Sequence, residues 1–142
     1  MMSIFFRHSL TEIKLAVRAA AMIAGAHIQV GLRPIVAMRQ WALPRARRTG
    51  SQDELLLAFR RAANRVPGTC LIRALALQRF LSVHGFESEL RIGVGLGPTG
   101  LLAHAWLLDG ERILIGGGRE AETFTVLTTW SDAAVAAAKR VR

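Results

Sequence analysis

The 142-residue chain has almost no cysteine, and its histidines are scattered. Cys70 is the only cysteine, so the chain cannot form an internal disulfide bond or a zinc site rich in thiolates. The four histidines lack a ligand spacing such as His-x-x-x-His. These absences indicate a reducing, cytoplasmic compartment, and we expect neither a metal nor another cofactor.

Acidic residues are scarce, above all in the first third of the chain. Residues 1–50 contain eight Lys or Arg and one acid, Glu12, and the whole chain carries a formal net charge of +9. Nucleic-acid binding calls for basic residues interleaved with exposed aromatics or placed on a recognition helix, whereas Arg45, Arg47 and Arg48 form a simple cluster. We therefore expect no nucleic-acid partner, and interpret the charge as a basic face for an acidic peptide or protein, or as a solvated loop.

Long uninterrupted apolar runs are also missing. The apolar stretch Leu15–Leu32 contains Arg18 and His27, and its longest uncharged run is shorter than the ~20 residues that a spanning helix needs. Gly25 and Gly31 interrupt it further, and no clean signal-peptide cleavage site follows. We expect no transmembrane span, while a peripheral membrane contact stays open.

The 51% apolar composition can fill the core of one domain, and the first half of the chain has helical periodicity. We expect residues 1–142 to form a single domain, with a basic helical N-terminal extension over 1–50 and a catalytic core over 51–142. The capping-box pattern Ser-Leu-Thr-Glu at Ser9 predicts a helix over about 9–25. Pro34 predicts a second helix that stops before Pro44.

Two further helices follow. A second capping box at Ser51 predicts a helix to about Arg65, which Pro67 and Gly68 end. The next helix is expected over Cys70–His84, with Gly85 as its C-terminal cap.

After Gly85 the apolar period changes from helical to alternating. The pattern predicts four short strands, over 87–92, 101–108, 111–115 and 123–127, and a short C-terminal helix over 131–142. The glycine-rich stretch 93–100 reads as a loop, and Asp109-Gly110 as a hairpin turn. No helix start or Lys-Ser/Thr follows the glycines, which argues against a phosphate-binding loop. The fold class expected is α+β, with helices packed on a small antiparallel sheet.

Cys70 lies where a Pro-Gly turn gives way to the apolar helical repeat. Free backbone N–H groups and the positive end of the helix dipole favour the thiolate at a helix start, so the position suits a nucleophile. Cys70 could instead be a buried small hydrophobe. His104, in the strand-like run Ala-His-Ala-Trp 34 residues later, is the candidate base that takes the thiol proton and later protonates the leaving amine.

Three ordered motifs then carry a resemblance: Cys-Leu-Ile-Arg-Ala-Leu-Ala-Leu from Cys70, His-Gly-Phe-Glu-Ser-Glu-Leu-Arg-Ile-Gly-Val from His84, and Ala-His-Ala-Trp-Leu-Leu-Asp-Gly from Ala103. Together they resemble the transglutaminase-like leader peptidases of lasso-peptide biosynthesis, which correspond to the C-terminal domain of the microcin-processing protein. The resemblance is strong over 67–117 and looser over 124–130. It implies a papain-like cysteine protease fold in which Cys70 matches the nucleophile and His104 the base.

The resemblance also implies partners. The substrate would be a ribosomally made precursor peptide, from which the protease removes the leader. The chain length leaves no room for the small domain that grips the leader, so a separate leader-binding protein is expected. An ATP-dependent, asparagine-synthetase-like lasso cyclase would then join the new N-terminus to a side-chain carboxylate.

One departure from the family pattern concerns the third catalytic residue. The family places an Asp on the strand after the histidine, and the matching place at 115–117 holds no acid. Asp109 is the nearest acid after His104, although a first hairpin residue more often forms the turn. Glu111 and Glu120 are further candidates, and a backbone carbonyl could also hold the imidazole.

Two more residues are candidates for the site. Arg73, one turn beyond Cys70, could contact substrate or the oxyanion site, or make a structural hydrogen bond. Trp106 shares a strand face with His104 and could wall the cleft or pack in the core. Two other functions stay open: a non-catalytic transglutaminase-like scaffold that binds the precursor or the cyclase, and a different papain-like acyl-transfer enzyme such as an amidase or a peptide crosslinker.

Overall fold

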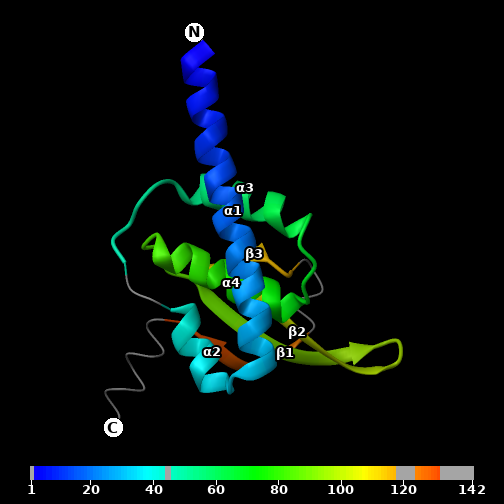
Figure 1. Ribbon diagram of the computed structural model, residues 1–142. Coiled ribbons are helices and arrows are strands. Elements are labelled where there is room, and N and C mark those ends of the chain that lie inside the picture. The colour runs from blue at the N-terminus through cyan, green and yellow to red at the C-terminus, as the bar shows by residue number, and fades with distance from the viewer. Residues whose placement is uncertain (1, 44–45, 118–123, 132–142) are drawn as a thin grey trace.

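The computed structural model describes residues 2–43, 46–117 and 124–131 (Figure 1). Within these ranges a layer of helices packs on a four-stranded antiparallel sheet. The helices are α1 (Met2–Leu32), α2 (Ile35–Ala42), α3 (Gln52–Ala63) and α4 (Cys70–Val83). The strands are β1 (Glu89–Gly97), β2 (Gly100–Asp109), β3 (Arg112–Ile115) and β4 (Thr125–Trp130), in the order β3-β2-β1-β4. The predicted α+β class is confirmed.

Helix α1 is much longer than the predicted helix over 9–25. It starts before Ser9, so Ser9 lies inside the helix and not at its start, and it continues through Gly25 to Leu32. A Cβ atom at Gly25 would lie 2.9 Å from the ring of Trp41 in α2, so the glycine allows the two helices to approach closely. Gly25 thus serves a helix contact, and the prediction that it ends the helix is wrong.

The first turns of α3 and α4 are capped by hydroxyl side chains. Ser51 accepts a hydrogen bond from the backbone N–H of Glu54 at 3.5 Å, as the capping box predicts. Thr69 accepts one from the N–H of Ile72 at 3.4 Å. Both helices therefore begin at residues that the local sequence specifies.

The C-terminus of α4 ends in a Schellman motif. The N–H of Gly85 donates to the carbonyl of Ser82, and the N–H of Phe86 donates to that of Leu81, both at 2.9 Å. Gly85 has φ +82°, which glycine adopts without the steric cost of a side chain. The prediction that Gly85 caps this helix is confirmed.

The glycine-rich stretch predicted as a loop is the second half of β1, which pairs with β2 as far as Gly97 and Gly100. A Cβ atom at Gly93 would lie 2.8 Å from the carbonyl oxygen of Thr125 in β4 and 2.9 Å from the ring of Trp106, and one at Gly95 would lie 3.0 Å from the ring of Phe124. The glycines leave room for two aromatic rings and, at Gly93, for the backbone of the neighbouring strand. The loop prediction is therefore wrong for most of this segment.

The remaining strands agree with the sequence except at their ends. Strands β2 and β3 both start and end within one residue of the prediction, whereas β4 begins two residues later and extends to Trp130. The predicted C-terminal helix lies, except for Ser131, outside the described residues.

The large core is formed by buried residues of all four helices and one sheet face, among them Ile23, Phe59, Phe80, Leu107 and Trp130. Helix α1 packs on α3 and α4, and its Ala19, Ile23 and Ala26 are fully buried. The basic N-terminal helices thus share one core with the later elements.

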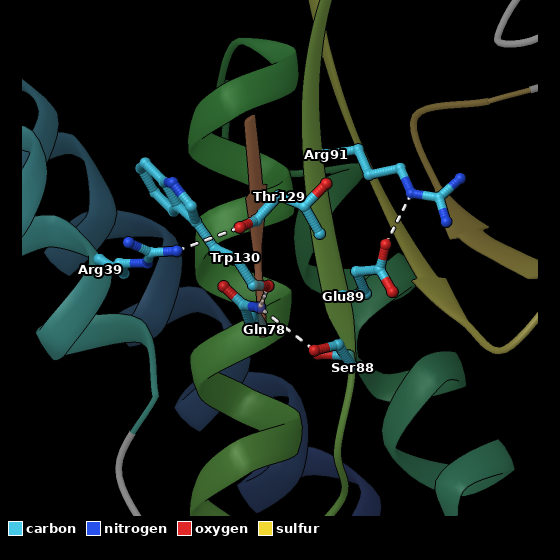
Figure 2. Close-up of polar contacts among 7 residues, drawn as sticks. All are labelled: Arg39, Gln78, Ser88, Glu89, Arg91, Thr129 and Trp130. Atoms are coloured by element: carbon cyan, nitrogen blue, oxygen red, sulfur yellow. Dashed lines mark hydrogen bonds and ion pairs between the residues drawn. The ribbon is translucent and has the colours of Figure 1, made fainter. Parts of the chain in front are cut away.

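Side chains of two helices hold the end of β4 (Figure 2). The fully buried Gln78 of α4 donates from Nε2 to the carbonyl of Trp130 at 2.9 Å and to that of Ser88 at 3.4 Å. Arg39 of α2 donates to the carbonyl of Thr129 at 3.1 Å. The bonds to Thr129 and Trp130 satisfy backbone carbonyls of the edge strand β4 and fix it against the helical layer.

Helices α2 and α4 are also joined through Trp41. The guanidinium of Arg79 lies 4.6 Å from the centre of the Trp41 ring, and it donates to the Trp41 carbonyl. Burial lowers the pKa of Arg79 below its ordinary value. This contact keeps α2 against the helix that begins with Cys70.

Candidate functional site

Cys70 is the first residue of α4, directly after the N-cap Thr69. Its side chain is half-buried and packs against the edge of the large core, and the thiol is free. The backbone N–H groups of a first helical turn have no acceptor within the helix. Cys70 therefore lies partly open to solvent, beside donors that can stabilise a negative charge.

The connection between α3 and α4 is held from two helices. His27 of α1 makes a 2.7 Å hydrogen bond from Nε2 to the carbonyl of Pro67. Arg73 of α4 donates to the carbonyl of Ala63 at the end of α3, at 3.4 Å. Arg73 thus binds a neighbouring helix, and its predicted role at the oxyanion site stays a prediction. Both contacts fix the turn that leads into Cys70.

The two faces of β2 belong to different clusters. Ala105 and Leu107 are buried in the large core with α4. Alternate residues point to the opposite face. There the His104 ring is stacked on the Trp106 ring with 6.0 Å between the ring centres, and its centre lies 5.2 Å from that of Phe124. His104 and Trp106 share a face, as predicted, and Phe124 completes an aromatic group around the imidazole.

The imidazole of His104 is held by a backbone carbonyl. Its Nε2 contacts the carbonyl oxygen of Gly116, the residue that follows β3. A carbonyl can only accept, so Nε2 carries the proton, and in the neutral ring Nδ1 keeps the lone pair of a base. Gly116 lies within 115–117, where the family resemblance places an acid. The backbone carbonyl was one of the alternatives that the sequence left open.

The candidate acids lie elsewhere. Asp109 accepts a 2.9 Å hydrogen bond from Gln52 at the start of α3, and it points to the opposite side of β2 from His104. Glu111 is exposed in the hairpin turn, and Glu120 lies outside the described residues. Among the residues that the structure describes, no group of three or more His, Cys, Asp or Glu could hold a metal ion.

Cys70 and His104 are on elements that pack together, α4 and β2. Across the described ranges no hydrogen bond joins their side chains, because Cys70 packs at the large core and His104 on the other sheet face. The direct Cys-His contact therefore stays a prediction.

The family comparison covers most of the chain. The model of the transglutaminase-like superfamily matches residues 9–129. The chain belongs to the transglutaminase-like superfamily. No curated protein and no solved structure matches it. The match includes most of α1 and all of the later helices and sheet except Trp130, so this transglutaminase-like unit contains both Cys70 and His104.

Substitution of Gly116 by alanine tests the imidazole contact. Gly116 has φ +84°, and an added Cβ would lie 2.5 Å from the carbonyl oxygen of Ala105, so the Gly116 backbone must shift. We expect a loss of about 1–3 kcal/mol in unfolding free energy, measured by urea denaturation. We also expect changed ¹⁵N shifts of the His104 ring by NMR.

Gly110→Ala is the matched control. Gly110 also has a positive φ, +60°, but a Cβ there meets nothing within 4 Å. Gly110→Ala should lower the unfolding free energy by about 1 kcal/mol and leave the His104 ring signals unchanged. Unchanged ring signals in Gly116→Ala would refute the role of the carbonyl.

Proposed function

We propose that this protein is a cysteine peptidase with a papain-like arrangement, in which Cys70 is the nucleophile and His104 the base. Its proposed role is to remove the leader from a ribosomally made precursor in lasso-peptide biosynthesis. The observation that carries the proposal is a cysteine that begins α4 together with a histidine whose Nε2 is held by a carbonyl, inside a transglutaminase-like chain. The three ordered sequence motifs support the leader-peptidase assignment.

The proposed reaction is acyl transfer through a thioester. Nδ1 of His104 takes the proton from Sγ of Cys70, and the thiolate attacks the carbonyl carbon of the scissile peptide bond. The Cys70 N–H, free at the start of α4, can donate to the oxyanion. The imidazolium then protonates the leaving amine as the C–N bond breaks, and water activated by the same Nδ1 hydrolyses the thioester.

The Gly116 carbonyl takes the place of the family's carboxylate in this proposal. It fixes the tautomer and the ring orientation, as a third group must. A neutral carbonyl stabilises an imidazolium less than a carboxylate does, since it carries only a partial charge. Trp106 and Phe124 pack beside the ring and restrict its rotation.

The proposed partners follow from the same role. They are the precursor peptide, a separate small leader-binding protein and an asparagine-synthetase-like lasso cyclase, in the cytoplasm. A basic segment that includes Arg47 and Arg48 is suited to an acidic leader or partner. Arg48 lies 4.9 Å from the centre of the Phe86 ring, close to the end of α4.

A second candidate function is a non-catalytic scaffold that binds the precursor or the cyclase. The separation of Cys70 and His104 onto different packing clusters favours it, as does the lack of an acid bonded to His104 among the described residues. A scaffold would bind the peptide and leave it whole.

Precursor cleavage distinguishes the two functions. The purified protein is mixed with the precursor and the leader-binding protein, and products are followed by mass spectrometry while binding is followed by fluorescence anisotropy. The peptidase proposal expects a free leader cut at a single bond. Binding without any cleaved product would refute it and support the scaffold.

A further inference from the structure

Helix α1 is apolar on two opposite faces. Its inner face, with Ala19, Ile23 and Ala26, is fully buried. Its outer face carries a second apolar row at helical spacing, which we name the outer stripe: Leu10, Ile13, Val17, Ala21, Ala24, Ile28 and Leu32. The large side chains of this stripe are exposed, from 49% for Leu10 to 78% for Leu32. A surface helix is ordinarily apolar on one face only, so the outer stripe requires an explanation.

The outer stripe is the outermost part of the helical layer. Helix α1 crosses over α3 and α4, while α4 packs against the sheet (Figure 1). Because the buried face of α1 covers these helices, the exposed stripe faces solvent. From residue 10 to residue 32 it extends about 33 Å at the ~1.5 Å rise per residue of a helix. The outer stripe therefore forms a long exposed ridge along the helix.

Cations flank the outer stripe on both sides. Lys14 and Arg18 are exposed on one side. On the other side, a groove between α1 and the end of α3 is lined by Ile13 and Val17 together with Arg61 and Arg65. The one acid in α1, Glu12, is paired with Arg61 at 3.2 Å.

We propose that the outer stripe of α1 binds the surface of an anionic lipid bilayer, with the helix lying in the plane of the interface. An apolar row flanked by Lys and Arg is the pattern of interfacial helices, in which aliphatic side chains enter the acyl boundary while cations contact lipid phosphates. This inference goes beyond the proposed peptidase function and does not depend on it.

The core contacts of α1 favour a helix that lies on the membrane over one that spans it. By length and composition alone, Leu10–Leu32 is apolar enough to cross a bilayer. A spanning helix would leave the core, however, and expose the surfaces of α3 and α4 that Ala19, Ile23 and Ala26 now cover. The interfacial arrangement keeps the inner face buried and uses only the outer stripe.

Charge also favours lipid over a second copy of the chain. Two outer stripes packed together would bring the flanking cations of one copy against those of the other, without any acid in the stripe to offset them. An anionic surface neutralises the same cations, each contributing favourably when it approaches the lipid phosphates. Acidic lipid headgroups therefore match both features of the ridge.

Co-sedimentation of the full chain with sucrose-loaded vesicles tests the proposal. We expect binding to vesicles of phosphatidylcholine mixed with phosphatidylserine, at least roughly tenfold weaker binding to phosphatidylcholine alone, and a decrease as salt rises. The variant Ile13→Ser/Val17→Ser/Ile28→Ser should lower the partition coefficient at least roughly tenfold. Lys14→Gln/Arg18→Gln should lower it roughly tenfold.

The matched control replaces two exposed leucines outside α1. Leu96 and Leu101, on the β1–β2 hairpin, are 89% and 80% exposed, so Leu96→Ser/Leu101→Ser removes comparable apolar surface. This variant should bind vesicles like the wild type, and all variants should keep the wild-type unfolding midpoint.

Four results would overturn the proposal. The first is that the wild type does not bind the anionic vesicles, and the second is that the hairpin control loses as much binding as the triple α1 variant. The third is that the protein stays on the vesicles after alkaline carbonate extraction, which indicates a spanning helix. The fourth is a dimer in sedimentation that the triple α1 variant disrupts, without any vesicle binding.

Discussion

Cys70→Ala is expected to stop precursor cleavage while leaving the fold intact. The substitution removes the only thiol that can form the thioester, so the rate should fall by about 10³-fold or more. Cys70 is half-buried at the edge of the core, and alanine suits a first helical turn, so unfolding free energy should change by only about 1 kcal/mol. Mass spectrometry of the precursor, with the leader-binding protein present, measures the first effect and urea denaturation the second.

Cys70→Ser provides the matched control for shape. Serine replaces the thiol by a hydroxyl of similar volume. The hydroxyl is a far weaker nucleophile than a thiol in a site that is not built to activate it. It should bind the precursor as the wild type does and cleave it no faster than Cys70→Ala. Cleavage by Cys70→Ala at the wild-type rate would contradict the assignment of the nucleophile.

Gly85→Ala is expected to lower the unfolding free energy by about 3 kcal/mol or more. Gly85 has φ +82°, and an added Cβ would lie 2.2 Å from the backbone nitrogen of Arg48. That backbone cannot simply move away, since the N–H of Thr49 donates to the carbonyl of His84 at 2.8 Å. Urea denaturation followed by circular dichroism measures the loss.

Gly50→Ala separates backbone strain from the clash. Gly50 has φ +75°, close to the value at Gly85, but a Cβ there meets nothing within 4 Å. Gly50→Ala should lower the unfolding free energy by about 1 kcal/mol, which is the strain of an alanine in the left-handed conformation alone. Equal losses in the two variants would show that the close approach of the Arg48 backbone contributes nothing.

The helix ends that depend on local chemistry could be predicted from the sequence. Ser51 and Gly85 act through bonds to residues at most four positions away, so their roles are visible in a short window. The predictions failed where a distant ring decides the outcome. At Gly25 the ring of Trp41, and at Gly93 the ring of Trp106 together with the carbonyl of Thr125, lie where a Cβ would stand, so these glycines allow a close approach and do not end the element.

The candidate site shows the same division. The sequence placed Cys70 at the start of its helix and His104 in a strand with Trp106, since both assignments rest on local periodicity. It could not show which face of β2 packs on α4, because that depends on how the whole sheet docks. The sequence also could not show that the carbonyl of Gly116 is the group that contacts His104, because every residue has a backbone carbonyl and the side-chain pattern does not single one out.

The central claim is that His104 activates Cys70, and the rate of Cys70 alkylation by iodoacetamide at neutral pH tests it most directly. A free cysteine is only a few per cent thiolate there, so an activated Cys70 should react about tenfold faster than free cysteine. His104→Ala should slow the reaction to the rate of the free thiol or below. Equal alkylation rates in the wild type and in His104→Ala would contradict the claim.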